Sequence, residues 1–298
     1  FSKKSHNAIN IISMVSVCGV VIATIALVCA LSVYNGFSDL VSTLFSNFDP
    51  ELKITLRIGK AFDPTTSSMQ KVKELPDVAI FSEVLEDNVL ACYNDRQVVA
   101  KVKGVDTNFD KLTLIDSVLI DGRFALREDV VDYATFGIGI ASRLGVKAGF
   151  VAPVELYAPK RDERINLANP ASSLQLEYVY ISGVFCTNQQ EYDDGYVIIP
   201  LALARSLFRY DKEVTAIELK LVEGADVSVV EKEIKNILGD EFVIQDRYEQ
   251  QESSYKMMQM EKWITFLILS FILMIALFNV VGSLSMLMIE KQQDVCTL

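Results

Sequence analysis

Two long runs without a charged residue lie near the ends of the chain, from Ala8 to Ser38 and from Trp263 to Ile289. A helix of about 20 apolar residues crosses a hydrocarbon layer roughly 30 Å thick. Helices are favoured because a lone strand cannot satisfy its backbone hydrogen bonds in lipid. The pattern predicts two transmembrane helices, over 11–34 and 263–289, with the short end segments 1–10 and 290–298 on one side of the membrane.

A signal peptide is the main alternative for the first run, because Lys3 and Lys4 precede it. The run is longer than the apolar part of a typical signal peptide, and no small-residue cleavage site follows it. Residues 26–28, before Cys29, also fit a lipoprotein cleavage site poorly. These observations favour a retained span over a cleaved or lipid-modified N-terminus.

The charges beside the two runs give a weak indication of orientation. Basic residues are enriched on the cytoplasmic side of a membrane. Lys3 and Lys4 favour the cytoplasm for the chain ends, whereas Lys256 and Lys262 flank the second run on its other side. The charge rule alone therefore leaves the orientation open.

Helical spacing continues beyond both runs, toward the region between them. Apolar residues recur at positions 37, 40, 41, 44, 45 and 48, until Asp49 and Pro50 end the pattern. The stretch 248–262 lacks glycine and proline and leads directly into the second run. We expect stalk helices over 35–48 and 248–262, which either transmit movement or act as stiff spacers.

The region between the runs begins and ends with the same pattern of elements. Segments 51–85 and 215–248 each read as strand, loop, helix, loop, strand. The two units, within 49–105 and 191–247, are expected to pack into one α+β subdomain. The apolar face of the helix in the second unit comprises Val229, Val230, Ile234, Ile237 and Leu238.

The central part, 106–190, is richer in β-branched residues and turns. Stretches such as "FVAPVELYAP" and "QLEYVYISGVF" are typical of strands. We interpret this part as a β-rich insertion in the α+β subdomain. Within it, "KRDERINLANPASS" is polar, contains a proline and has no periodic pattern, which predicts a projecting loop or hairpin tip.

Composition supports a chain with a few spans and one large water-exposed domain. The 298 residues are 51% hydrophobic and 22% charged, with a mean hydropathy of +0.29. The formal net charge is −11, and an acidic surface argues against a nucleic-acid partner.

The sequence contains no recognisable set of catalytic or metal-binding residues. Its one histidine, His6, lies at the expected membrane edge, and the motifs of phosphate-binding loops, serine hydrolases and zinc proteases are absent. The stretch "GIGIASRLG" lacks the spacing of a nucleotide-binding loop. We therefore expect no enzyme activity, cofactor or metal in this chain.

Carboxylate pairs and cysteines outside the runs have ordinary structural interpretations. The pairs Glu86–Asp87 and Asp193–Asp194 are adjacent in sequence, which is more typical of solvated turns than of an acid–base pair. Cys92 and Cys186 are the two cysteines that could meet outside the membrane. Their spacing is not that of a metal site, and we expect free buried thiols.

Small and polar residues mark the faces of the two runs that should contact other helices. Small residues at spacings of three and four let helices approach closely in lipid, and polar side chains within a span should face protein or a cavity. These packing residues are Ser16, Gly19, Ala23, Ala26 and Ala30 in the first run, and Asn279, Ser283 and Ser285 in the second. We expect further spans, from this protein or a partner, to pack against them.

Four stretches in a fixed order carry a family resemblance. They are "NIISMVSVCGVVIATIALVCALSVYNGF", ending in Asn35, Gly36 and Phe37; "GIGIASRLGVKAG" followed by "VELYAPK"; "SGVFCTNQQEYDDGYVIIPLALARSLF", with Gly183, Tyr192, Asp193 and Pro200; and "FNVVGSLSMLMIEKQQDV". Together they resemble the lipoprotein-releasing ABC permeases of the LolC/LolE type, in the superfamily of the MacB efflux permease and FtsX. The resemblance covers nearly the whole chain.

The resemblance implies a fold and a set of partners. The fold is a membrane protein in which two transmembrane helices with stalk extensions flank a MacB-like periplasmic domain, an α+β repeat subdomain with a β-rich insertion. Such permeases have four spans, so we expect this chain to be part of a longer protein with two further spans. The partners implied are a second permease subunit, identical or related, and a separate ABC ATPase that binds ATP and Mg.

The resemblance also implies how such a subunit works in the bacterial inner membrane. ATP hydrolysis would be coupled through a cytoplasmic helix that begins near Glu290, Lys291 and Asp294. Movement of the periplasmic domains would then release a lipoprotein to a soluble carrier. The nearest equivalent of the family's carrier-binding loop comprises Arg164, Ile165, Asn166, Leu167, Ala168, Asn169 and Pro170. These residues do not distinguish a LolC-like from a LolE-like subunit.

Other classes of membrane protein fit parts of the same pattern. A MacB-like efflux permease would move a substrate of the periplasm with the same two spans. A two-span receptor would carry a signalling domain after residue 298, where a permease would carry two more spans. A membrane-anchored enzyme fits least, because no catalytic set is visible.

Overall fold

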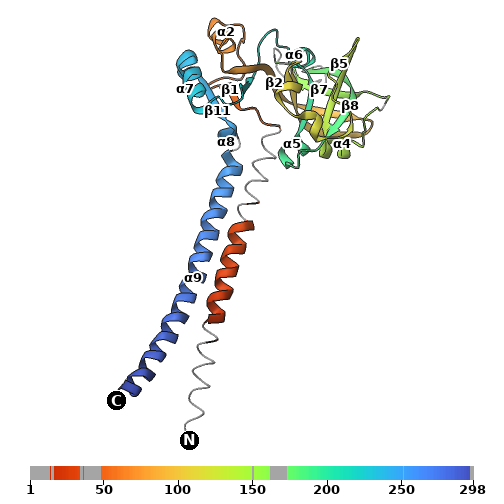
Figure 1. Ribbon diagram of the computed structural model, residues 1–298. Coiled ribbons are helices and arrows are strands. Elements are labelled where there is room, and N and C mark those ends of the chain that lie inside the picture. The colour runs from red at the N-terminus through yellow and green to blue at the C-terminus, as the bar shows by residue number, and fades with distance from the viewer. Residues whose placement is uncertain are drawn as a thin grey trace. The chain divides into compact units, whose positions relative to one another are not determined.

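The computed structural model describes residues 14, 17–33, 36, 48–149, 151–161, 173–250 and 252–295. The chain divides into two compact units. One comprises the two ends of the chain, 1–42 and 251–298, and the other comprises residues 43–250. Figure 1 shows the helices of the first unit and the strands of the second.

The unit of the chain ends consists of two helices in the described residues. Helix α9 (Glu252–Val295) has 44 residues, and its stretch Met260–Gly282 is long and apolar enough to cross a membrane. The apolar helix Val17–Val33 is shorter than a full span in the described part of the chain. The expected span over 263–289 therefore has a matching helix, and the number of spans stays a prediction.

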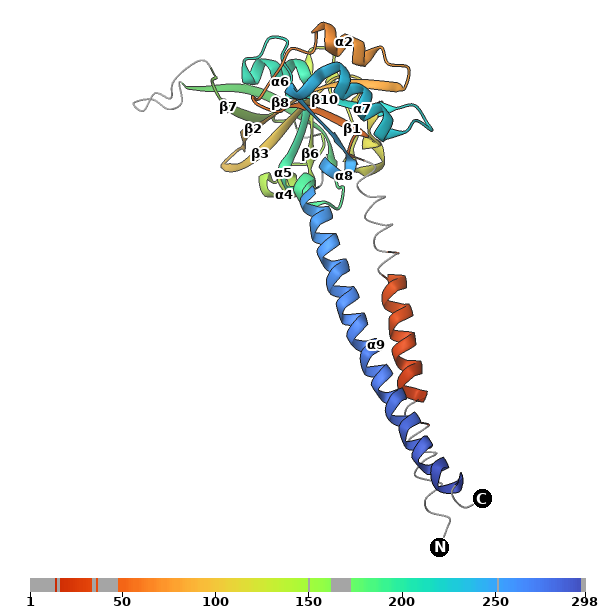
Figure 2. The same ribbon diagram turned by 90° about the vertical axis from the view of Figure 1, so that its left-hand side faces the viewer.

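Helix α9 is continuous through three regions that the sequence analysis separates. It contains most of the expected stalk, the whole expected second span, and residues 290–295 of the expected coupling helix. The first stalk, 35–48, lies outside the described residues except for Gly36 and Phe48. Helix Val17–Val33, in red, runs alongside α9, in blue, in Figures 1 and 2.

The unit of residues 43–250 contains a sheet built from the two predicted repeat units. Its strands lie in the order β11–β1–β10–β2, and every neighbouring pair is antiparallel. Helices α2 and α7 cover one face (Figure 2). The elements are β1 (Leu52–Leu56), α2 (Ser67–Lys73), β2 (Val78–Tyr93), β10 (Ala216–Leu221), α7 (Val227–Leu238), η3 (Gly239–Glu241) and β11 (Phe242–Asp246).

The strand, helix, strand pattern is confirmed in both repeat units, and so is their packing into one sheet. On α7, Val230, Ile234 and Leu238 are buried against the sheet. Val229 was expected on the same face but is 59% exposed, because a residue next to Val230 on a helix is turned by about 100° from it.

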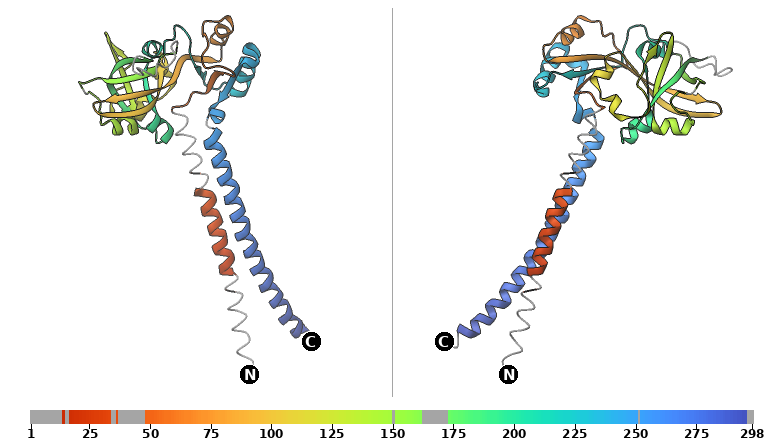
Figure 3. Two further views of the ribbon diagram at one scale, coloured as in Figure 1. Left: turned by 180° about the vertical axis from the view of Figure 1, so that it is seen from behind. Right: turned by 45° about the vertical axis from the view of Figure 1, so that its right-hand side comes forward.

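The second core lies inside a closed barrel. The strands pair in the cycle β2–β3–β9–β6–β8–β7 and back to β2. Figure 3 shows these strands beside the sheet, with β2 in orange passing from one to the other. The remaining barrel strands are β3 (Arg96–Val105), β6 (Val131–Gly137), β7 (Val154–Pro159), β8 (Leu174–Phe185) and β9 (Tyr196–Pro200).

The barrel does not coincide with the expected insertion, 106–190. It takes β2 and β3 from before this range and β9 from after it. Closing the barrel leaves none of these strands as an edge, and the apolar side chains that point inward form its core. The expected β-rich part is therefore continuous with the repeat subdomain through β2.

Short elements complete this unit. Pro200 ends β9 and precedes α6, so this proline stands at a step from strand to helix. Gly137 and Gly139 of the "GIGIASRLG" stretch lie against α5: a Cβ on Gly137 would lie 2.4 Å from the Asp193 carbonyl oxygen, so glycine is needed for close packing. These elements are α3 (Phe109–Leu112), η1 (Ile115–Val118), β4 (Leu119–Gly122), β5 (Arg127–Glu128), α4 (Ile138–Leu144), α5 (Gln190–Gly195), α6 (Leu201–Phe208) and α8 (Arg247–Gln250).

Candidate functional site

The chain enters and leaves the domain at neighbouring positions, which we call the two roots. The first root is Phe48–Glu51, just before β1, and the second is α8, just after β11. Strands β1 and β11 are antiparallel partners, with Leu52 opposite Asp246. Antiparallel pairing therefore brings together two segments that are about 200 residues apart and that each continue in sequence toward a hydrophobic helix.

Hydrogen bonds and an ion pair join the two roots. Arg247 Nε donates to the Asp49 carbonyl oxygen at 3.2 Å, and Gln250 Nε2 donates to the Pro50 carbonyl oxygen at 3.2 Å. The Arg247 guanidinium also lies 3.8 Å from Glu51 Oε1. A hydrogen bond from a charged group contributes more than a neutral one. A displacement of one root therefore acts directly on the other.

An aromatic socket holds the side chain of Phe48, which is 1% exposed. Its ring centroid lies 5.6 Å from that of Phe185 and 4.5 Å from that of Tyr192. The ring of Phe109 meets it edge-on at 6.3 Å. Such ring pairs contribute roughly 0.5–1.5 kcal/mol each beyond the burial of their surface. The socket fixes the first root against β8, α5 and α3.

Tyr192 fixes the first root by a second contact. Its hydroxyl donates a hydrogen bond to the Asp49 carboxylate. Burial raises the pKa of Tyr192 well above its usual range, and the Asp49 carboxylate raises it further. The phenol therefore stays neutral and remains a donor at physiological pH. Tyr192 and the neighbouring Asp193 belong to the stretch "EYDDG", and Tyr192 is the member of it that reaches the root.

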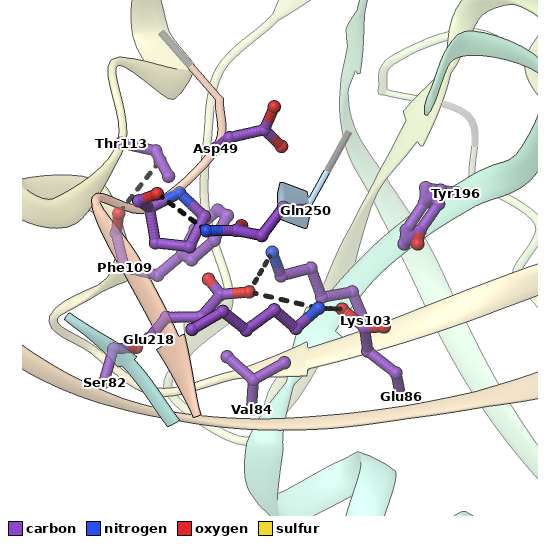
Figure 4. A network of polar contacts seen from close by, with 12 residues as sticks. Asp49, Ser82, Val84, Glu86, Lys103, Phe109, Thr113, Tyr196, Glu218 and Gln250 are labelled. Carbon is purple, nitrogen blue, oxygen red and sulfur yellow. Dashed lines mark hydrogen bonds and ion pairs between the residues drawn. The ribbon is translucent and has the colours of Figure 1, made fainter. Parts of the chain in front are cut away.

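A layer of charged side chains lies near the roots (Figure 4). It is on the face of the sheet opposite α2 and α7, because Lys53 and Glu218 alternate with strand residues that pack against those helices. Lys103 Nζ lies 2.8 Å from Glu218 Oε1, and Lys53 Nζ lies 3.9 Å from the same oxygen. Glu86 forms ion pairs with Lys53, whose Nζ lies 3.2 Å from Oε1, and with Lys101, whose Nζ lies 2.8 Å from Oε2. Glu218 is 0% exposed and the Lys103 side chain 4%. This charge layer links the sheet, through β1 and β10, to the barrel strand β3.

The charges of Glu86 and Lys53 persist at neutral pH. Burial favours the protonated form of Glu86, but the ammonium groups of Lys53, Lys103 and Lys101 outweigh it and lower the pKa of Glu86 well below its usual range. Burial would likewise lower the pKa of Lys53, but the Glu86 and Glu218 carboxylates outweigh it and raise that pKa. Glu86 and Lys53 therefore face each other as ions rather than as neutral partners.

Glu86→Gln is expected to lower the stability of the domain. It is also expected to reduce the loss of stability that the parent shows as the pH falls into the acid range. Because the pKa of Glu86 is lowered from an ordinary value of 4.5, its contribution is complete above that value and is lost as the pH falls below it. At neutral pH we expect a loss of roughly 1.5–3 kcal/mol, typical of a lost hydrogen bond to a charged group. Melting temperatures of the full-length protein between pH 7 and pH 3 measure both effects.

Glu233→Gln is the matched control for this prediction, because Glu233 is exposed on α7. We expect its melting curve to follow that of the parent across the pH range. A Glu86→Gln protein with the acid dependence of the parent would contradict the assigned role of Glu86.

A family profile described as the MacB-like periplasmic core domain matches residues 13–237. The chain belongs to this family. The match covers the first repeat unit, the barrel and the second repeat unit into the last turn of α7, so the MacB-like core domain here includes the first root, the socket and the charge layer. Strand β11 and the second root, Arg247–Gln250, lie after the matched range.

Two relatives of this MacB-like protein, named LolC and LolE, agree with that assignment. The lipoprotein-releasing system transmembrane protein LolC of Neisseria meningitidis is 25% identical over 307 residues, with 100% of this chain and 70% of the relative covered. LolE of Haemophilus influenzae is 23% identical, with 98% and 70% covered. The periplasmic region of MacB from Actinobacillus actinomycetemcomitans is 10% identical with a TM-score of 0.48, covering 68% of this chain and 92% of that one. The resemblance to LolC/LolE-type permeases of the MacB-like superfamily is confirmed.

The expectation that both carboxylate pairs lie in solvated turns is wrong: Glu86 and Asp87 lie within β2, and Asp193 and Asp194 lie within α5. Glu86 lies within strand β2 and its side chain is 9% exposed. Asp193 is 7% exposed, and its Oδ1 accepts hydrogen bonds from the Thr187 amide at 2.7 Å and the Thr187 hydroxyl at 2.9 Å. Adjacent residues on a strand point to opposite faces, so Glu86 is buried while Asp87 stays nearer solvent and pairs with Lys60.

The expected packing residues of the first span lie in helix Val17–Val33, apart from Ser16, which is outside the described residues. Gly19, Ala23 and Ala30 are partly buried, whereas Ala26 is exposed. In α9 the backbone of Asn279, Ser283 and Ser285 is helical, but the side chains of Asn279 and Ser283 are outside what the structure describes. The packing role of these residues stays a prediction.

Two other groups of expected site residues cannot be placed. Glu290, Lys291 and Asp294 lie in the last turns of α9, with side chains outside the described part. The carrier-binding candidates at 164–170 lie between β7 and β8, within residues 162–172, which the structure does not describe. Both assignments stay predictions.

The described cysteines and metal-ligand residues form no joint site. Cys92 and Cys186 are both free thiols, as expected, although Cys92 is buried and Cys186 is only partly buried. Among the described residues, no three histidine, cysteine, aspartate or glutamate side chains group around a point where a metal could bind. That this chain carries no cofactor stays a prediction.

Proposed function

We propose that this chain is a permease subunit of an ABC transporter that releases lipoproteins from the inner membrane of a bacterium. The MacB-like family assignment and the similarity to LolC and LolE proteins support a permease of this kind. The observation that carries the proposal is the direct bonding of the two roots to each other, through Arg247 and Gln250. A domain held in this way suits a machine that passes movement from membrane helices to the periplasm.

In the proposed mechanism the chain itself does no chemistry. A separate ATPase binds ATP and Mg and closes against the cytoplasmic end of α9, near Glu290, Lys291 and Asp294. The continuous helix α9 carries that movement to the second root, and the bonds between the roots pass it to the first root and to the socket. The moving domain, together with that of a second permease subunit, releases the lipoprotein from the membrane to a periplasmic carrier.

Co-purification of the full-length protein with its membrane partners tests the proposal. A soluble ATPase together with an acylated protein is the expected result. An ATPase without acylated cargo would favour an efflux permease of the MacB type, whose periplasmic domain shares this family. Absence of any ATPase would contradict the transporter assignment.

Asp294→Ala is expected to uncouple ATP hydrolysis from transport. The physical reason is that loss of a charged group at the helix end weakens one contact with the ATPase, by roughly 1.5–3 kcal/mol if it is a charge-assisted hydrogen bond. The ATPase should remain bound, because one contact is a small part of an interface. The measurement is lipoprotein release and ATP hydrolysis by the same reconstituted complex.

Gln293→Ala is the matched control at the neighbouring uncharged position. It is expected to leave release and hydrolysis at parental levels. Unchanged release in Asp294→Ala would remove Asp294 from the coupling surface.

A further inference from the structure

The side chain of Phe48 covers the charge layer. Lys103 Nζ lies 5.5 Å from the centroid of the Phe48 ring and 5.1 Å from that of Phe109. At these distances an ammonium group is attracted to the face of an aromatic ring. Phe48 therefore has two roles at once: it fills the aromatic socket and it closes the Lys103–Glu218 pair off from water.

The covered pair is imperfectly satisfied. The charge layer contains three lysines and two glutamates, Lys53, Lys101, Lys103, Glu86 and Glu218, so one positive charge is in excess. Within the described residues neither carboxylate oxygen of Glu218 accepts a well-formed hydrogen bond. Removing ions from water is repaid only where geometry and hydrogen bonding are good. Water reaching this pair would therefore stabilise an uncovered form.

Phe48 is also the first described residue of the domain after the first helix. The chain from helix Val17–Val33 reaches the domain through residues 34–47 and then Phe48. The bonds between the roots begin one residue later, at Asp49 and Pro50. Phe48 can therefore leave its socket while Asp49–Glu51 remain attached to α8 and β10.

We propose that Phe48 is a plug that tension on the first root withdraws from the aromatic socket, and that hydration of the Lys103–Glu218 pair then holds the domain in the unplugged form. Two opposing effects make this device bistable. Burial of the ring and its attraction to Lys103 favour the plugged form, and hydration of the buried ions favours the unplugged one. The tension on the first root rests on the proposed function, in which an ATPase moves the membrane helices. The fit of Phe48 in its socket does not depend on that function.

A cysteine at position 82 reports whether the charge layer is open. Ser82 is 0% exposed and lies directly opposite Glu218 in the pairing of β2 with β10. Ser82→Cys is nearly isosteric, and a maleimide reaches it only when water does. Labelling is followed in the full-length protein in lipid nanodiscs, with the site of modification located by mass spectrometry because the chain has other cysteines.

Phe48→Ala in the Ser82→Cys protein is expected to raise the labelling rate at position 82 by about tenfold or more. The rate rises in proportion to the fraction of molecules in the unplugged form. Phe48→Leu, which keeps part of the plug, should give an intermediate rate. The matched control is Phe62→Ala, a buried phenylalanine whose ring meets that of Phe242 at 5.2 Å on the opposite face of the sheet. An equal increase with Phe62→Ala, or no increase with Phe48→Ala, would overturn the plug.

The ion pair is tested by replacing both of its members with apolar residues. Lys103→Met with Glu218→Leu removes the buried ion pair that water would stabilise in the unplugged form. The melting temperature of this double variant should equal or exceed that of the parent. Under ATP turnover with the partner ATPase, the Ser82→Cys protein is expected to label faster than at rest, and the double variant is expected to label at its resting rate. A double variant that labels like the Ser82→Cys protein during turnover would remove the ion pair from the device.

The labelling at rest and the labelling under ATP turnover test different claims. The first tests the plug, and the second tests whether the proposed transporter supplies the tension. The comparison of Phe48→Ala with Phe62→Ala needs no ATP and no partner, so it decides the plug even where no ATPase accompanies the protein. Failure to recover an ATPase contradicts the proposed function alone. Parental labelling in Phe48→Ala contradicts the plug alone.

Discussion

Lys103→Ala is expected to lower the free energy of unfolding by about 3–5 kcal/mol, the range found when one partner of a buried ion pair is removed. The physical reason is Glu218, which is 0% exposed and lies 2.8 Å from Lys103. Without Lys103 the nearest cation to this carboxylate is Lys53 at 3.9 Å. The melting temperature of the full-length protein at neutral pH measures the loss.

Lys101→Ala is the matched control, on the same strand and in the same layer. The Lys101 side chain is 40% exposed, so its removal should have a small effect, about 1 kcal/mol or less. Where Lys103→Ala does not accumulate, Lys103→Met with Glu218→Leu should restore a folded protein, because no charge is then left alone. Equal losses in Lys101→Ala and Lys103→Ala would contradict the difference in burial on which the prediction depends.

Arg247→Met is expected to lower lipoprotein release by about tenfold with little effect on ATP hydrolysis. Arg247 joins the second root to the Asp49 carbonyl oxygen and to Glu51. A charge-assisted hydrogen bond contributes roughly 1.5–3 kcal/mol, and its partial exposure places Arg247 at the lower end, near the 1.4 kcal/mol that corresponds to a factor of ten. Release and hydrolysis by the reconstituted complex are the measurements.

Arg57→Met is a close control, because Arg57 occupies the opposite end of the same strand pair. Its Nε donates to the Asp240 carbonyl oxygen at 2.9 Å, joining β1 to the segment before β11 without contacting either root. We expect normal release in this variant. A similar loss in both variants would show that stability of the strand pair, rather than the joining of the roots, sets the rate.

Much of the architecture could be predicted because its signals are local. The composition of the two charge-free runs is enough to distinguish them from the rest of the chain. The repeat units combine alternation on the strands with helical spacing on α2 and α7, and both patterns follow from burial of one face. Pro200 marks the end of a strand and the start of a helix.

The charge layer could not be predicted in the same way, because an alternating strand predicts a solvated polar face. On β10, Ile217 and Leu219 point to the apolar core while Glu218 points to the other face. That second face is covered by β3, α3 and Phe48, which are distant in sequence. The signal that could have indicated it is the matching alternation of opposite charges, with lysines at 53, 101 and 103 and glutamates at 86 and 218.

The closed barrel was missed for a related reason. Periodicity identifies strands but not their partners, and β2 pairs with three of them along its length. Its 16 residues exceed the usual strand, which is the one local indication that it serves two structures. The boundary expected at residue 106 lies just after β3, whereas the second half of β2 already belongs to the barrel. Nothing in the sequence distinguishes the first half of β2 from its second half.

The position of β1 in the sheet has a consequence for the order in which the domain forms as the chain is synthesised. Strand β1 is among the first elements of the domain, but both of its partners, β10 and β11, come more than 150 residues later. The hairpin of β2 and β3 can form early because its strands are adjacent. Until residues 216–246 are available, β1 has no neighbour on either side and exposes unpaired backbone groups. Joining the first root to the second is therefore among the last steps of folding, and the charge layer is completed only when the two ends of the domain meet.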